Sequence, residues 1–384
     1  MAGIIYPEKV KKIFEIFKKY GYEAYAVGGC VRDSLMGKSP ADWDITTSAP
    51  PEKTLEIFER ENIRTLPTGL KHGTVSVLLD GEIFECTTFR IDGDYKDSRH
   101  PESVLFTDKL ELDLSRRDFT VNAMAASDTR GVCDFFGGRD DLKNRIIRCV
   151  GNPHLRFSED ALRILRGVRF ATVLDFDIEA KTLCAIKDLS YTLSDISAER
   201  KTVEFSKILC SEHANRGAKL LFDTGVISQL IPDVKTVPSD LTILDGEISL
   251  RLATFMYQSG ARDLSRLRLS NIQKKNISIL LSPIEFMDTD EGARRTLARY
   301  GELAISACKL QGRNALLGLV VEQKKLNPAL SISQLKIDGN ALLSLGIQPE
   351  NIGKTLSALL DKVICHPELN EKNTLIEESK KLNA

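Results

Sequence analysis

The chain has 384 residues, of which 53 are Lys or Arg and 54 are Asp or Glu. This length exceeds the usual size of one hydrophobic core, so we expect more than one domain. A content of 42% hydrophobic and 28% charged residues is ordinary for a globular protein and excludes a disordered or fibrous chain. The formal net charge of −1 argues against a protein that coats nucleic acid through bulk charge, although it leaves local basic patches open.

Membrane insertion and secretion are not expected from the sequence. Apolar stretches such as 315–321 are far shorter than the roughly 20 residues that span a bilayer. The first residues reach lysines by position 9 without the apolar core and cleavage site of a signal peptide. The eight cysteines are scattered without a C-x-x-C pair, which disfavours zinc. We therefore expect a cytoplasmic protein with reduced thiols.

The first part of the chain alternates between helical and strand patterns. In chain order we predict a helix from Pro7 to Gly21, a strand over 23–27, a helix with Arg32 and Leu35, a strand over 42–46, a helix over 51–60, and strands over 74–79 and 83–89. The last two strands are separated by Asp80-Gly81, which predicts a hairpin turn.

The rest of the chain is predicted to be mainly helical. Residues 91–101 are polar and charged, which predicts a loop. From about residue 110 helices dominate, with short strands such as 132–135. The predicted fold class is α+β, with a head of about 140 residues that holds a mixed sheet, followed by an all-helical remainder.

Two aspartates in Asp42-Trp43-Asp44 are the sharpest local feature. On a strand, residues two apart point to the same face, so the two carboxylates would converge. Paired hard oxygen donors suit Mg²⁺, which takes one or two protein carboxylates and completes its shell with water and phosphates. A D-x-D alone also fits a solvated loop.

A glycine pair, Gly28-Gly29, precedes these aspartates and is followed by Arg32. Paired glycines after a strand let backbone N–H groups approach phosphate oxygens, and Arg32 adds a charged donor. A tight strand-to-helix turn explains the same residues. A third cluster comprises Arg117, Asp118 and Asn122, which at helical spacing would share a face able to bind ribose and phosphate; an exposed charged turn is the alternative.

The segment 156–170 is predicted to be one helix that carries a charged face with Asp160, Arg163, Arg166 and Arg169. A carboxylate accepts hydrogen bonds and a guanidinium donates them. When the two groups are adjacent, the carboxylate can accept from an amine of a base and the guanidinium can donate to the neighbouring ring nitrogen. Cytosine and adenine share an edge of this kind, and guanine and uracil lack it. A solvated, ion-paired helix face is the alternative.

Together these motifs resemble a known family. VGGCVRD (27–33), D-x-D (42–44), RRDFTVNA (116–123) and EDALRILRGVRF (159–170) occur in the order and spacing of class II tRNA nucleotidyltransferases, the CCA-adding enzymes. YKDSRHP (95–101), SAERKTVEF (197–205) and the segment from Leu335 also match. The resemblance implies a polymerase-β-like head over 1–140, a neck over 141–215, a body over 216–325 and a tRNA-binding tail over 326–384.

The resemblance also implies roles for individual residues. Asp42 and Asp44 would hold two catalytic Mg²⁺ ions, and Asp160 with Arg163 would select C and A as a protein template. The residues implied to bind the nucleotide are Gly29, Arg32, Arg117, Asp118, Asn122, Arg166 and Arg169. Asp97 and Arg99 would take part in the switch from C to A addition. The template would be supported by Glu199, Arg200 and Glu204.

The implied activity is addition of CCA to the tRNA 3′ end from CTP and ATP with release of pyrophosphate. Three alternatives stay open: an enzyme that adds only A or only CC, a poly(A) polymerase, and a non-catalytic tRNA-binding protein. The loop with Asp97 and Arg99 argues against a pure CC-adding enzyme, and the two metal carboxylates argue against a non-catalytic protein.

Overall fold

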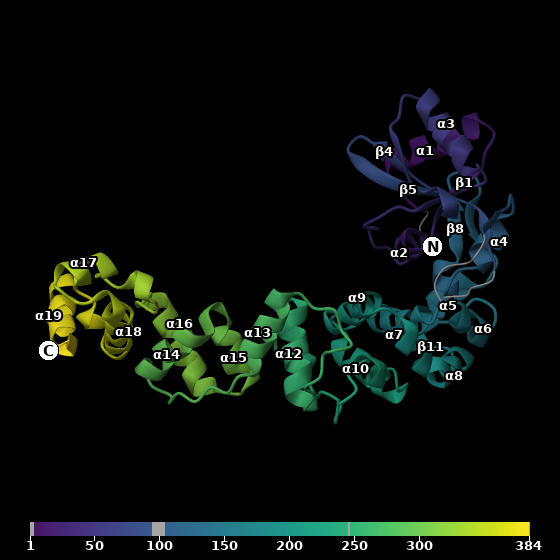
Figure 1. The fold of residues 1–384 in the computed structure, drawn as a ribbon. Helices are drawn as coiled ribbons and strands as arrows, with labels where there is room; N and C mark the ends of the chain where they lie inside the picture. Colours follow the sequence, from purple (N-terminus) through teal and green to yellow (C-terminus); the bar gives the residue numbers. More distant parts are fainter. Residues whose placement is uncertain (1–3, 94–103, 245, 384) are drawn as a thin grey trace. The chain divides into compact units, whose positions relative to one another are not determined.

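The computed structural model describes residues 4–93, 104–244 and 246–383. The chain divides into two compact units, one formed by residues 1–233 with 263–268 and the other by residues 234–262 with 269–384 (Figure 1). No described helix is long and apolar enough to cross a membrane. The predicted α+β class is confirmed, because a mixed sheet occupies the first part of the chain and helices dominate the rest.

The head contains a seven-stranded sheet in the order β3-β4-β5-β2-β1-β8-β9. All neighbouring strands are antiparallel except β2 and β5, which are parallel. The strands are β1 (Ala24–Val27), β2 (Ile45–Thr47), β3 (Thr65–Gly69), β4 (Thr74–Leu79), β5 (Glu82–Thr88), β8 (Met124–Ser127) and β9 (Gly131–Asp134).

The predicted hairpin is confirmed. β4 and β5 pair in register up to Leu79 opposite Glu82, leaving a two-residue turn. Asp80 and Gly81 both have positive φ, at 48° and 80°, as a type I′ turn requires. Two smaller sheets flank this one: β6 (Arg90–Asp92) pairs with β7 (Val104–Phe106), and β10 (Ile146–Ile147) pairs with β11 (Asp177–Ile178).

Apolar residues cover both faces of the head sheet. Ala24 and Ala26 of β1 pack into a core with residues of two helices, in which the rings of Phe17 and Phe58 meet at 5.3 Å. The alternate β1 residue Tyr25 packs on the other face, as the two-residue period of a strand dictates. The helices of the head are α1 (Glu8–Lys19), α2 (Gly29–Leu35), α3 (Pro51–Arg60), α4 (Leu110–Ser115) and α5 (Gly138–Asn144).

The rest of the first unit is helical. It comprises α6 (Pro153–Glu159), α7 (Leu162–Leu174), α8 (Ala180–Leu189), α9 (Ala198–Leu209), α10 (Ala214–Asp223) and α11 (Ile227–Leu230). α7 is its central helix and contacts α9, α10 and α6. Its Gly167 lets the ring of Phe119 approach, since a Cβ there would lie 3.1 Å from that ring.

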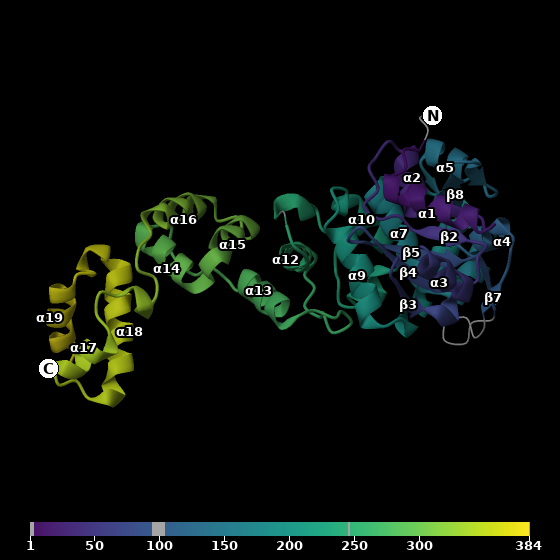
Figure 2. The same cartoon turned by 90° about the horizontal axis from the view of Figure 1, so that it is seen from above.

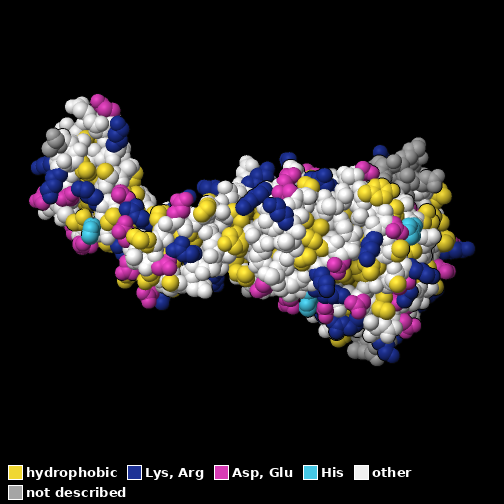
Figure 3. Space-filling model, turned by 90° about the horizontal axis from the view of Figure 1, so that it is seen from below, with side chains coloured by type: hydrophobic (Ala, Val, Ile, Leu, Met, Phe, Trp, Pro, Cys, Tyr) yellow, Lys and Arg dark blue, Asp and Glu magenta, His cyan; other side chains and the backbone are white. Residues whose placement is uncertain are grey.

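The second unit contains helices alone among its described regular elements (Figure 2). They are α12 (Ile248–Ser259), α13 (Asn271–Leu281), α14 (Asp290–Tyr300), α15 (Ala304–Leu310), α16 (Asn314–Leu326), α17 (Gly339–Ser344), α18 (Pro349–Cys365) and α19 (Lys372–Asn383), with two short 3₁₀ turns between α14 and α17 and others elsewhere in the unit. A separate apolar core joins α17, α18 and α19. On the face shown in Figure 3, basic and acidic side chains are interspersed, in keeping with the near-zero net charge.

Candidate active site

Asp42 and Asp44 lie just before strand β2, not within it as predicted, because β2 begins at Ile45. Its partner β1 ends at Val27, whose N–H still donates to the Asp44 carbonyl oxygen at 3.0 Å, and the chain then turns away at Gly28. The hydrogen bonds between the two strands therefore end at Asp44 and do not include Asp42. Both are exposed residues at the end of a buried strand.

The two carboxylates are suited to a divalent cation. Neither side chain forms a hydrogen bond or an ion pair within the described part of the chain. Desolvation by surrounding protein atoms and repulsion from Asp42 raise the pKa of Asp44, while Arg117 lowers it. The described residues contain no cluster of three or more His, Cys, Asp or Glu that would form a complete metal cage. A bound cation would take its other ligands from water and substrate phosphates, as Mg²⁺ commonly does.

Gly28 brings an arginine close to the backbone beside these aspartates. Its φ of 81° is a conformation that side-chain-bearing residues rarely adopt, and a Cβ at this position would lie 3.0 Å from Arg117 Nη1. The Gly28 N–H donates to the Met124 carbonyl oxygen at 3.1 Å, while Gly29 begins helix α2. The glycine pair therefore forms a tight turn from strand to helix. Because Gly28 has no side chain, the Arg117 guanidinium can lie close to the backbone there.

The predicted nucleotide-binding residues form a chain of contacts from α2 to α7. Arg32 Nη1 donates to Asn122 Oδ1 at 2.6 Å, and Asn122 Nδ2 donates to Asp118 Oδ1 at 3.4 Å. Asp118 Oδ2 then accepts from Arg166 Nε at 2.7 Å. Burial raises the pKa of Asp118, but Arg166, Arg163 and the Phe119 N–H together lower it further, so the net pKa lies below its ordinary value.

Residues 118–122 are not the α-helix that was predicted. Phe119 is extended and fully buried, and only 120–122 form a short 3₁₀ turn. The extended conformation is fixed by pairing with a distant segment, because Val150 N–H donates to the Asp118 carbonyl and Thr120 N–H to the Arg148 carbonyl. Asp118 and Asn122 nevertheless meet, as predicted.

Asp113 is a central residue that the sequence reasoning missed. It is fully buried and accepts hydrogen bonds from Thr46 Oγ1 at 3.1 Å and from Arg116 Nε at 3.0 Å. Arg117 Nη2 lies 3.9 Å from its carboxylate, while the buried Arg117 Nε has no hydrogen-bond partner in the described chain. In the sequence, Asp113 lies three residues before Arg116 and four before Arg117. This helical spacing could have indicated their contact.

Asp160 interrupts the predicted helix over 156–170. α6 ends at Glu159, α7 begins at Leu162, and Asp160 between them is extended with φ −141°. Its Oδ1 accepts from the Leu162 N–H at 3.0 Å, which satisfies a free donor at the start of α7. The aspartate therefore caps the second helix and does not lie within a continuous one.

The two predicted template residues have different partners. Asp160 Oδ2 accepts from Arg200 Nη2 of α9 at 2.8 Å. The buried Arg163 donates to Glu159 Oε2 at 2.7 Å and to the Arg116 carbonyl at 3.1 Å. Their side chains are thus both anchored, but by separate groups, and not by each other.

Arg166 and Arg169 lie on the same side of α7, around Phe170. Arg169 donates to Glu204 and lies 3.8 Å from the centre of the Phe170 ring. Arg166 and the head residue Arg32 lie 5.2 and 5.4 Å from the same ring. Phe170 was predicted only as part of a motif; the structure gives it contacts with three guanidinium groups.

The supporting residues divide into two groups. Arg200 contacts Asp160, and Glu204 contacts Arg169. Glu199 is exposed and lies 3.7 Å from the exposed Arg268, away from Asp160. Asp97 and Arg99 lie outside the described residues.

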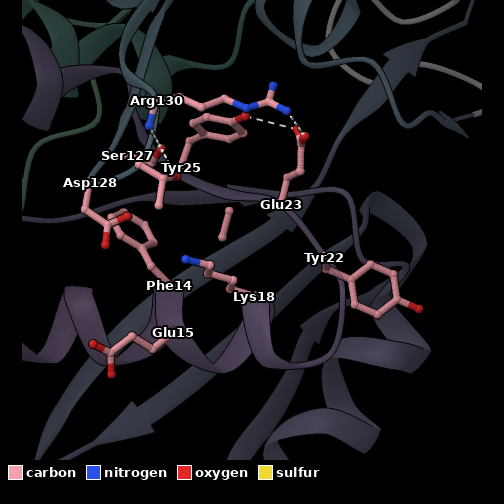
Figure 4. A pocket seen from close by; sticks show the side chains of 11 residues that line it. Phe14, Glu15, Lys18, Tyr22, Glu23, Tyr25, Ser127, Asp128 and Arg130 are labelled. Carbon is pink, nitrogen blue, oxygen red and sulfur yellow. Dashed lines mark hydrogen bonds and ion pairs between the residues drawn. The ribbon is translucent and has the colours of Figure 1, made fainter.

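A hollow of about 410 Å³ on the head contains none of the predicted site residues. It is lined by α1 and the turn between β8 and β9 (Figure 4). Its Glu23 accepts hydrogen bonds from Tyr25 and Arg130, so these polar groups pair with one another.

Comparison with known proteins matches both parts of the chain. The family "Poly A polymerase head domain" matches residues 24–148, and "Probable RNA and SrmB- binding site of polymerase A" matches residues 175–237. The CCA-adding enzyme of Streptococcus thermophilus is 35% identical over 388 residues, covering 96% of this chain and 95% of that one. The CCA-adding enzyme of Enterococcus faecalis is 39% identical over 363 residues, covering 90% and 88%.

A solved structure is also similar over the whole chain. It is the Bacillus stearothermophilus CCA-adding enzyme in complex with CTP, with a TM-score of 0.81 and 31% identity, covering 99% of this chain and 98% of that one.

Proposed function

The chain belongs to the class II CCA-adding enzymes, which are tRNA nucleotidyltransferases, and on this premise we propose how its residues perform the reaction. The substrates are the tRNA 3′ end, CTP and ATP. The 3′-hydroxyl attacks the α-phosphate of the incoming nucleotide, and pyrophosphate leaves. We assign this chemistry to the head over 1–140, base selection to the neck over 141–215, and tRNA binding to the body over 216–325 and the tail over 326–384.

Asp42 and Asp44 hold Mg²⁺ at the end of β2. The donor set supports this, because two unpartnered carboxylates beside phosphate-binding groups leave coordination positions for substrate oxygens. When bound, a pair of such ions activates the attacking hydroxyl and stabilises the leaving pyrophosphate. The protein's own contribution is to position the reactants and to place fixed charges around them.

The triphosphate binds beside Arg117. The buried cluster around Asp113 contains three arginines and two aspartates, all with mostly buried side chains, namely Arg90, Arg116, Arg117, Asp92 and Asp113. The guanidinium groups of this cluster are donors suited to phosphate oxygens. Gly28 places no side chain between the backbone and the triphosphate at this turn. Arg32, Asp118 and Asn122 orient the ribose and phosphates.

Asp160 and Arg163 select the base. A fixed acceptor and a fixed donor complement the edge shared by cytosine and adenine, while guanine and uracil leave buried polar groups unmatched. Arg200 orients Asp160, and Glu204 orients Arg169. Asp97 and Arg99 are assigned to the change from C to A addition on their resemblance to the family loop.

The observation that carries this proposal is that an unpartnered carboxylate pair and the buried guanidinium of Arg117 lie together at the Gly28 turn. The test uses three purified tRNAs, which lack CCA, end in C or end in CC, with labelled CTP or ATP. We expect C to be added to the first two and A to the third. A product limited to the final A would replace CCA addition with A addition, and long A tracts would indicate a poly(A) polymerase.

A further inference from the structure

A pocket of about 530 Å³ lies beside the template helix, within the first unit. Its walls come from the turn after α2, from α7, and from the end of α9 with the turn that follows it. The charged and titratable groups that line it are Lys38, Arg169, Lys207, Cys210, Glu212 and His213. None of the metal carboxylates, the glycine pair or Arg117 lines this pocket. It is therefore a separate place from the nucleotide-binding contacts, joined to them only through Arg169.

Arg169 is a rigid donor at the wall of this pocket. Its side chain is only 11% exposed, its Nε donates to Glu204, and its guanidinium lies 3.8 Å from the centre of the Phe170 ring. The described residues provide no hydrogen-bond acceptor for its two Nη groups. A guanidinium held on one edge and open on the other is preorganised to bind phosphate oxygens.

Two lysines add positive charge to the same pocket. The side chains of Lys38 and Lys207 are exposed and form neither a hydrogen bond nor an ion pair with any described residue. With Arg169 they place three cations around the hollow, against the single carboxylate of Glu212, while Glu204 lies on the other edge of Arg169. Concave sites with one dominant sign of charge concentrate ligands of the opposite sign.

We propose that this pocket binds a backbone phosphate of the RNA strand that is being extended, a few nucleotides before its 3′ end. Lys38 is four residues from Asp42, so their Cα atoms are at most about 14 Å apart. Stacked nucleotides advance about 3.4 Å each, so a strand with its 3′-hydroxyl at the aspartates reaches Lys38 within a few nucleotides. The inference rests on the proposed function, because it needs the growing RNA end at Asp42 and Asp44.

The test is the double variant Lys38→Ala/Lys207→Ala, with a tRNA ending in CC and ATP as substrates. We expect the KM for tRNA to rise about tenfold, and the dependence of log KM on log salt to become shallower by about one unit. The KM for ATP and the kcat at saturating tRNA should stay within about twofold of wild type. Lys187→Ala is the matched control, since this exposed lysine of α8 does not line the pocket.

Three other outcomes would overturn the proposal. A higher KM for ATP with an unchanged KM for tRNA would mean that the pocket holds the nucleotide's own triphosphate. Unchanged KM values for both would mean that the lysines are solvated surface groups, and an equal loss with Lys187→Ala would indicate a general charge effect. An inactive wild-type protein that still binds tRNA less tightly after the double substitution would contradict the proposed function but not this site.

Discussion

Arg200 of α9 donates to the Asp160 carboxylate across 2.8 Å, and this contact joins the segment between α6 and α7 to a helix forty residues later in the chain. Asp160 also caps α7 through the Leu162 N–H. One carboxylate oxygen is therefore used to start the helix, while the other is held by the guanidinium. In this arrangement the direction of Asp160 depends on Arg200.

Replacing Arg200 should weaken base selection without removing the reacting groups. We expect Arg200→Ala to lower the preference for CTP over UTP about tenfold, because one lost charge-assisted hydrogen bond corresponds to about 1.5 kcal/mol. Competition between labelled nucleotides measures this preference. Glu199→Ala is the matched control on the same helix, since Glu199 contacts the exposed Arg268 instead. An equal loss in both variants would show that the effect is not specific to Asp160.

Removing a metal carboxylate should abolish the reaction while leaving tRNA bound. We expect Asp44→Ala to reduce incorporation by at least about 1,000-fold at any Mg²⁺ concentration. Without this ligand, no cation would be held in place to activate the tRNA 3′-hydroxyl or to stabilise the leaving pyrophosphate. Gel-shift titration should give a tRNA Kd within about threefold of wild type. Activity restored by raising Mg²⁺ would argue that Asp44 is not a ligand.

The Gly28 turn provides a test of the triphosphate site. Gly28→Ala places a Cβ 3.0 Å from Arg117 Nη1 at a φ of 81°. We expect the KM values for CTP and ATP to rise about tenfold, because Arg117, which we propose to bind the triphosphate, must move. Gly37→Ala is the control, because Gly37 has a similar φ of 74° but no atom within 4 Å of an added Cβ. This variant introduces the same backbone strain without displacing a neighbouring side chain. Similar KM values for the two variants would contradict the role of Arg117.

The Asp118–Arg166 pair should make stability depend on pH. The pKa of Asp118 in the folded protein is lower than its ordinary value, so the stabilisation is present above the ordinary aspartate pKa, about 4, and is lost as the pH falls through the lower folded-state pKa. Asp118→Asn should cost about 3 kcal/mol of unfolding free energy at pH 7, and the difference from wild type should shrink below about pH 4. Urea unfolding of both proteins at several pH values measures it. A constant difference would mean that the lost charge is not the cause.

The elements that sequence reasoning predicted are those specified locally. The Asp80-Gly81 turn carries its own positive φ values, and the two flanking strands follow from it. Strand β8, with the sequence MAAS, was missed because alanine has little preference for strands and its conformation comes from pairing with β1 and β9.

The sequence predicted candidate site residues, but it did not predict which side chains they contact. The break at Asp160 was missed because an aspartate fits either an exposed helix face or a helix cap, and only the Leu162 contact decides between them. Contacts such as that of Arg200 with Asp160, or of Asp113 with Thr46, join residues far apart in the chain. No periodicity in the sequence reports them.

In the proposed function, Asp160 and Arg163 form a protein surface that selects C and A. The most direct measurement compares incorporation of all four nucleotides by wild type and Arg163→Ala on a tRNA that lacks CCA. Glu159 keeps a second partner in Arg156, at 2.8 Å, so the fold should persist, and a circular dichroism melt verifies this. We predict that wild type rejects GTP and UTP and that the variant incorporates UTP at least about tenfold more readily relative to CTP. An active variant with unchanged selectivity would contradict the claim.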